Sequence, residues 1–134
     1  MRYAVLIDGD DGNYGAVIPD APGAYGGGAT VEEALMSAQE GLALWATSMR
    51  EDGKAVPRPR DFKTLHADQE VQEAIAAGAV LASVALVPVA GKVTRVNVSM
   101  DAGVLEFIDT EAKSLGLTRS GYIERAARAF ATMR

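Results

Sequence analysis

The last third of the chain, residues 92–134, contains one short strand pattern followed at once by two helix patterns. Residues 94–100 alternate polar and apolar side chains, which predicts a strand with one apolar face. Apolar residues then recur at helical spacing (104, 108, 112, 115) up to Gly116, and again after Thr118 (122, 123, 126, 127, 130). One strand and two helices are too few to enclose a core, so this segment is expected to pair with a second copy of itself.

Pairing would place the two strands side by side as a ribbon, and such ribbons enter the major groove of DNA. Arg95, Asn97 and Ser99 lie on the polar face of the predicted strand, and we expect them to contact bases. Arginine reads guanine and asparagine reads adenine through paired hydrogen bonds, each giving about 1–3 kcal/mol of discrimination. The alternative interpretation is an ordinary solvated strand face.

Phosphate contacts are expected at both ends of this arrangement. Lys92 and Thr94 flank the predicted strand. The amides of the first turn of a helix are unpaired and carry the positive end of its dipole, so a phosphate can bind there. The residues expected at phosphates are therefore Lys92, Thr94, Thr118, Arg119 and Ser120, although Thr118 is also a plausible helix N-cap.

The charge distribution supports a division of the chain into two parts. The net charge is −5, but residues 1–91 carry six Lys or Arg and thirteen Asp or Glu, a net charge of −7. Residues 92–134 carry seven basic and five acidic residues, a net charge of +2. Because phosphate contact is local to the domain that makes it, the basic segment is compatible with DNA. The acidic segment favours a basic protein partner.

The sequence of the first part, residues 1–91, predicts an α+β domain with the element order β-β-β-α-β and a further short helix before the last strand. Two strands, 2–7 and 14–18, flank an Asp-Gly-rich turn, and a short third strand or glycine-rich loop covers 24–29. Thr30 and Glu33 have capping-box spacing and open a helix to about Asp52. After an extended connector at 56–61, a short helix is expected at 68–78 and a strand at 79–89. A hinge at 90–92 leads to the second domain, 92–134.

Several functional classes are not supported by the residues. The chain has no cysteine, which excludes disulfides and thiolate metal sites, and no apolar run long enough to span a membrane. Asp8, Asp10 and Asp11 crowd into one turn, and neither Asn13 nor Pro19 provides what a calcium loop needs at its sixth and twelfth positions. We therefore expect no enzyme, no catalytic residue, no metal and no cofactor. Nucleic-acid hydrolysis by the acidic domain is kept as the least favoured hypothesis.

Motifs along most of the chain resemble those of the HicB antitoxins of bacterial type II toxin–antitoxin systems. The N-terminal match runs through Tyr3 to Ile7, the loop at 18–23 (Ile-Pro-Asp-Ala-Pro-Gly), the helix start at 28–34, and the Val-Pro-Arg-Pro exit at 56–59. The C-terminal match, at 95–98, 108–112 and 115–120, is similar to a ribbon-helix-helix domain. Ser99 departs from the basic residue that many such strands carry, which leaves the operator sequence open.

This resemblance implies a partial RNase-H-like N-terminal domain that binds and occludes a HicA-like, mRNA-cleaving toxin. It also implies a C-terminal ribbon-helix-helix domain that dimerises, binds the operon's own promoter and represses it in the cytoplasm, with a tetramer left open. The expected toxin-binding residues are Asp20, Tyr25, Glu32, Glu33 and Glu40. The alternative function is a stand-alone ribbon-helix-helix regulator whose first domain senses a ligand or oligomerises.

Overall fold

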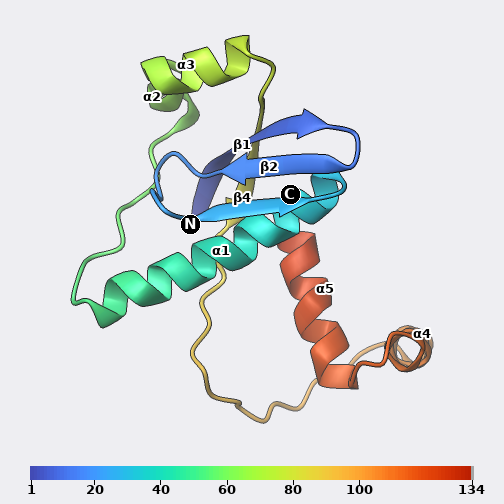
Figure 1. The fold of residues 1–134 in the computed structure, drawn as a ribbon. Helices are drawn as coiled ribbons and strands as arrows, with labels where there is room; N and C mark the ends of the chain where they lie inside the picture. Colours follow the sequence, from blue (N-terminus) through green and yellow to red (C-terminus); the bar gives the residue numbers. More distant parts are fainter. Residues whose placement is uncertain (134) are drawn as a thin grey trace. The chain divides into compact units, whose positions relative to one another are not determined.

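The computed structural model describes residues 1–133 of the chain (Figure 1). They form two compact units: unit 1 is Met1–Val89, and unit 2 begins at Ala90 and continues to the end of the chain. Among the described residues, no helix has both the length and the apolar composition needed to cross a membrane.

Unit 1 is built on a four-stranded antiparallel sheet with the order β3-β2-β1-β4. The strands are β1 (Arg2–Asp10), β2 (Asn13–Val17), β3 (Tyr25–Gly28) and β4 (Val80–Ala85). All four predicted strands are confirmed. β1 continues three residues beyond its predicted end at Ile7. β4 is shorter than its predicted span and ends before Pro88, which has no amide hydrogen to donate to a neighbouring strand.

The long helix α1 (Val31–Glu51) covers one face of this sheet (Figure 1). The predicted N-cap is confirmed, because Thr30 Oγ1 accepts from the Glu33 amide at 3.1 Å. The return bond from Glu33 is made one residue before the N-cap, since Glu33 Oε2 accepts from the Ala29 amide at 2.8 Å. The main core lies between the helix and the sheet. Its largest apolar members are fully buried: Tyr3, Val5, Ile18, Leu42 and Val84.

Two short helices, α2 (Phe62–His66) and α3 (Gln69–Ala76), lie on the other side of the sheet (Figure 1). Leu65 and Val71 from these helices pack with Ala4 of β1 in a second, smaller cluster. The helix predicted at 68–78 is confirmed as α3, whereas α2 was not predicted. Five residues are fewer than two helical turns and give no readable periodicity, so its main signal is Asp61, whose carboxylate caps the helix at the Thr64 amide.

Unit 2 contains the two predicted helices, α4 (Ala102–Ser114) and α5 (Arg119–Met133). Asp101 caps α4, and Gly116 follows it with a φ of +70°, a conformation that glycine adopts without strain. The strand predicted at 94–100 is not formed, since residues 93–101 have no strand conformation. A strand needs a hydrogen-bonded neighbour, and the rest of the described part of unit 2 is helical or irregular.

Candidate functional site

The segment before α4 exposes both its polar and its apolar side chains. Arg95, Asn97 and Ser99 are exposed, as the predicted base contacts require. Their apolar neighbours are also exposed, with Val96 at 71% and Val98 at 67% of their full accessible surface. Apolar side chains exposed to this extent are available for contact with a partner.

The same segment borders a cleft of about 680 Å³ that lies wholly within unit 2. Val96, Val98 and Met100 line one part of it, and Leu105 of α4 and Ile123 of α5 line another. Among the described residues of unit 2, Ala112 alone is buried. Unit 2 therefore has apolar residues arranged around an open space instead of a core of its own.

The three residues predicted to bind phosphate at the start of α5 differ in their contacts. Thr118 Oγ1 accepts from the Gly121 amide at 3.0 Å, so this side chain is an N-cap. Arg119 donates through Nε and Nη2 to the two carboxylate oxygens of Asp109 in α4, each at 2.8 Å. This pair lowers the pKa of Asp109 and raises that of Arg119. The guanidinium thus joins α4 to α5, whereas Ser120, in the first turn of α5, is exposed.

Asp20, a predicted toxin contact, is held inside unit 1. Its carboxylate accepts from the Arg60 amide at 2.7 Å and from Arg60 Nε at 2.6 Å, and its side chain is only 9% exposed. Arg60 Nη1 also binds Asp68 Oδ2 at 2.9 Å. Asp20 therefore ties the Pro-Asp-Ala-Pro-Gly loop to the connector before α2.

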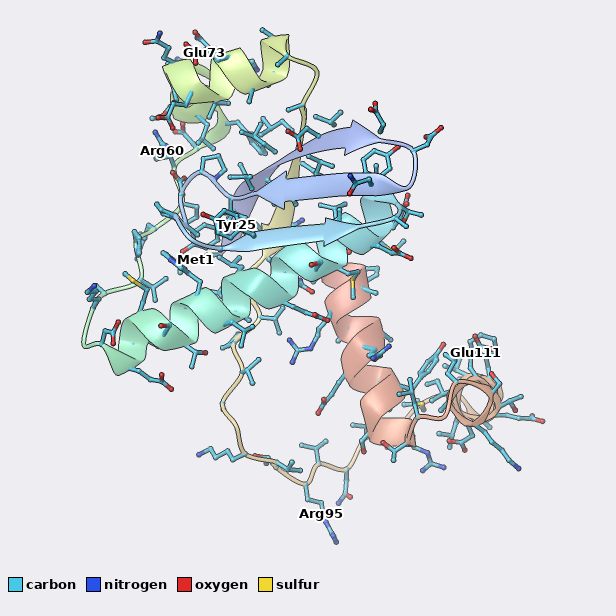
Figure 2. The ribbon with its side chains drawn as sticks, in the orientation of Figure 1. Met1, Tyr25, Arg60, Glu73, Arg95 and Glu111 are labelled. Carbon is cyan, nitrogen blue, oxygen red and sulfur yellow. The ribbon has the colours of Figure 1, made fainter. Side chains whose placement is uncertain are left out.

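The other four predicted toxin contacts do not share one surface. Glu33 belongs to the capping box of α1, next to the exposed Glu32, and Glu40 is exposed further along this helix. Tyr25 lies on β3 (Figure 2) and is 66% exposed. Its neighbour Gly26 faces α1, because a Cβ added there would meet the Ala38 amide nitrogen at 2.3 Å. Alternation along the strand puts Tyr25 on the opposite face of the sheet.

Sequence reasoning missed the partner of Tyr25 on that face, Val17 of β2. The two residues are directly opposed in the β2–β3 register, and Val17 is 47% exposed. The signal was present in Ala16-Val17-Ile18, a run of three apolar residues in which Ala16 and Ile18 are buried. In a strand, the middle residue of such a run must face the other side.

The aspartates clustered in the first hairpin are not arranged to bind a metal ion. Asp8 and Asp10 lie on β1 and Asp11 is in the turn, where the Tyr14 hydroxyl donates to it at 3.4 Å. Burial, together with this acidic neighbour, raises the pKa of Tyr14. Across residues 1–133, no group of three or more His, Cys, Asp or Glu side chains is placed to hold a metal ion.

Comparison with known proteins gives one family over nearly the whole chain. Residues 3–127 match the family described as the HicB_like antitoxin of bacterial toxin-antitoxin systems. The crystal structure of the Burkholderia pseudomallei antitoxin HicB shares 34% sequence identity and covers 95% of this chain and 96% of its own, with a TM-score of 0.55.

Two further similarities cover parts of the chain. Antitoxin HicB 2 of Photorhabdus laumondii subsp. laumondii is 39% identical over 59 residues, which are 44% of this chain and 42% of that protein. A chain of the HicA3 and HicB3 toxin-antitoxin complex shares the fold over 66% of this chain and 100% of its own. Its sequence identity is 24% and its TM-score 0.54.

Proposed function

The chain belongs to the HicB_like antitoxin family of bacterial toxin-antitoxin systems, and from this premise we propose that it neutralises a HicA-like, mRNA-cleaving toxin and represses its own operon. Unit 1, in the role of the partial RNase-H-like domain, binds the toxin. Unit 2, in the role of the ribbon-helix-helix domain, dimerises and binds operator DNA. The protein acts in the cytoplasm as a stoichiometric inhibitor and not as an enzyme.

The open apolar surface of unit 2 carries the proposal of a dimer. Val96, Val98 and Phe107 are each more than half exposed, and Val96 and Val98 line the cleft together with further apolar side chains. Covering such surface stabilises an assembly by about 25 cal/mol per Å². A second copy supplies both an identical strand, which pairs with residues 94–100, and the helices that fill the cleft.

DNA binding follows from the polar face of the paired strands. With the apolar side chains turned into the dimer, Arg95, Asn97 and Ser99 of both copies lie together on the outer face. A two-stranded ribbon of this kind fits the major groove, where arginine and asparagine distinguish base pairs. Lys92, Thr94 and the amide of Ser120 are the proposed phosphate contacts. The net charge of +2 in residues 92–134 favours this role over one for the acidic unit 1.

Toxin binding is assigned to unit 1 on charge and on similarity of fold. Residues 1–91 have a net charge of −7, which favours a basic partner. A protein with the same fold is part of the HicA3 and HicB3 toxin-antitoxin complex. Unit 1 also has its own buried core, so the proposal gives it a partner of its own.

Co-purification tests the antitoxin function most directly. The chain is expressed with the product of the neighbouring gene, which we expect to be a small basic protein, with an affinity tag on one of the two. We expect a stable complex and restored growth of cells in which that protein alone is toxic. A stand-alone regulator would give operator binding without either result, and this outcome would overturn the proposal.

The site of dimerisation is tested with the full chain and with a truncation. Val98→Asp introduces a charge into the proposed dimer core, and deletion of 92–134 removes it. Light scattering is expected to show a smaller assembly in both cases. If both proteins keep the original number of chains per assembly, dimerisation lies in unit 1 and the assignment to unit 2 is wrong.

A further inference from the structure

A row of four apolar residues crosses the whole sheet of unit 1 on the face opposite α1. The strand registers align Leu81 with Leu6, Leu6 with Val17, and Val17 with Tyr25. Leu81 and Leu6 pack in the cluster beneath α2 and α3. Val17 and Tyr25 extend beyond this cover and are 47% and 66% exposed. Half of the row is therefore partly buried by packing against the cluster of α2 and α3, and the other half is exposed.

A cleft of about 230 Å³ lies where the covered half of this row meets the uncovered half. Leu6 and Val17 line it from the sheet, and Val71 lines it from α3. Asp8 of β1 and Glu70 of α3 line the same cleft. The space thus has apolar walls and two carboxylates, and it has room for one side chain of moderate size.

The next row on this face has almost no side chains. Asp8 is aligned with Gly15, and Gly15 with Gly27. The carboxylate of Asp8 lies toward this row, because its Oδ1 is 3.4 Å from where a Cβ on Gly15 would stand. A partner can therefore approach the backbone of β2 and β3 closely beside Val17 and Tyr25.

The carboxylates of Asp8 and Glu70 have no ion pair and no side-chain hydrogen bond within residues 1–133. By contrast, the carboxylates of Asp20 and Asp68 are both ion-paired with Arg60. Unpaired carboxylates beside exposed apolar side chains complement a protein surface that presents Lys or Arg around an apolar side chain. Self-association through this face would bring the same carboxylates of two copies together, which opposes a second copy as the occupant.

We propose that this surface, formed by Val17, Tyr25, the Gly15–Gly27 pair and the adjoining cleft, is the docking face for the basic toxin. The proposal, which rests on the antitoxin function above, assigns two contacts. An apolar toxin side chain enters the cleft beside Val17, and basic toxin side chains pair with Asp8 and Glu70. Of the residues expected from the sequence, Tyr25 belongs to this face, whereas Glu32 and Glu40 of α1 do not.

The test measures binding of the co-encoded toxin to the full chain and to variants by calorimetry or surface binding. Val17→Lys and Tyr25→Lys replace exposed apolar side chains with positively charged ones, which repel a basic partner. Each is expected to weaken binding roughly ten-fold or more, mainly through faster dissociation. The control is Leu44→Lys, the same change at an α1 residue that is 69% exposed, and its affinity is expected to stay at the wild-type value.

The carboxylates are tested by Asp8→Asn combined with Glu70→Gln. We expect slower association and a weaker dependence of affinity on salt than in the wild type. The control pair is Glu40→Gln with Glu51→Gln, two exposed α1 residues. Fluorescence of Trp45, the only tryptophan in the chain, monitors folding of every variant, and light scattering monitors its assembly.

The outcomes distinguish the proposed docking face from the antitoxin function on which it rests. If the wild-type chain forms no complex with the co-encoded protein, the antitoxin function fails and the docking face fails with it. If the wild-type complex forms and the Val17 and Tyr25 variants bind equally well, only the docking face is wrong. A change of assembly mass in folded Tyr25→Lys, without loss of toxin binding, would instead assign this face to self-association.

Discussion

The backbone amide and the side chain of Arg60 both donate to the carboxylate of Asp20, at 2.7 and 2.6 Å. This contact joins residues that are 40 positions apart in the sequence. Two further contacts hold the same region: Trp45 Nε1 donates to the Pro22 carbonyl at 3.0 Å, and the Tyr3 hydroxyl donates to the Pro57 carbonyl. The proline-rich loop and the connector are therefore part of the folded unit 1, although both look like free loops in the sequence.

Arg60→Ala is expected to destabilise unit 1 because it leaves the largely buried Asp20 carboxylate without its charged donor. Hydrogen bonds to charged groups contribute about 1.5–3 kcal/mol, and partial exposure of Arg60 reduces the expected loss to roughly 1–2 kcal/mol. Urea unfolding followed by Trp45 fluorescence measures this change, since that side chain binds the same loop. Arg58→Ala, an exposed arginine two residues away, is the control, and equal midpoints for the two variants would contradict the assigned role.

The same substitution is expected to change the titration of Asp68. The hydrogen bond from Arg60 is the main cause of the lowered pKa of Asp68, whereas the Thr64 amide lowers that of Asp61. In Arg60→Ala, carbon-detected NMR titration is therefore expected to show a higher pKa for Asp68 and an unchanged pKa for Asp61. A parallel rise at both carboxyls would indicate a general loss of structure.

These lowered pKa values also set the direction of the pH dependence. A carboxyl whose pKa is lower in the folded state contributes stability above its unfolded pKa, near 4, and this contribution is lost as the pH falls through the folded value. Unit 1 is thus expected to lose stability below about pH 4. Arg60→Ala is expected to reduce the part of this loss that comes from Asp68. Urea unfolding at a series of pH values measures the free energy of unfolding and therefore this change.

Gly26→Ala is expected to destabilise unit 1 by separating α1 from β3. An added Cβ would stand 2.3 Å from the Ala38 amide nitrogen and 2.7 Å from its Cα, which are backbone atoms that do not move independently of the helix. Overpacking of this kind costs about 1–3 kcal/mol. The control is Gly15→Ala, where the nearest atom, Asp8 Oδ1, is 3.4 Å away at the end of a side chain. Similar unfolding midpoints for the two variants would contradict the close approach.

The sequence predicts the elements of this fold well because their signals are local. The Thr30 N-cap, the glycine after α4 and the strand-forming composition of β1 each depend on residues close together in the chain. The segment at 24–29 is predicted from the sequence as a short strand or a glycine-rich loop, but the reason for its glycines appears only in the structure. Gly26 and Gly28 allow α1 to lie directly against β3.

The parts that sequence reasoning missed depend on contacts between distant residues. Asp20 was expected to bind the toxin because its long-range partner, Arg60, has no signal near it in the sequence. Likewise, Arg119 was expected at a phosphate, whereas its guanidinium pairs with Asp109 of the preceding helix. Val17 was not expected at a surface because its role follows from the pairing of β2 with β3. The strand at 94–100 remains a prediction about a second chain.

The different environments of Arg95 and Arg119 lead to different expected effects on DNA binding. Arg95 is exposed beside Asn97, so Arg95→Ala removes a proposed base contact and leaves the fold intact. Its specific affinity for promoter DNA is expected to fall by about 1–3 kcal/mol, with little change for scrambled DNA. Arg119→Ala instead breaks the link between α4 and α5, and we expect it to weaken binding to both DNAs while lowering the melting temperature of unit 2.

Fluorescence anisotropy with labelled promoter and scrambled duplexes separates these two effects, and toxin neutralisation is measured on the same proteins. Arg50→Ala, an exposed arginine at the end of α1, is the control for a lost positive charge outside unit 2. Both unit 2 variants are expected to neutralise the toxin, because the proposed docking face lies in unit 1. If Arg95→Ala loses promoter binding and neutralisation together while remaining folded, the division of the two functions between the units is wrong.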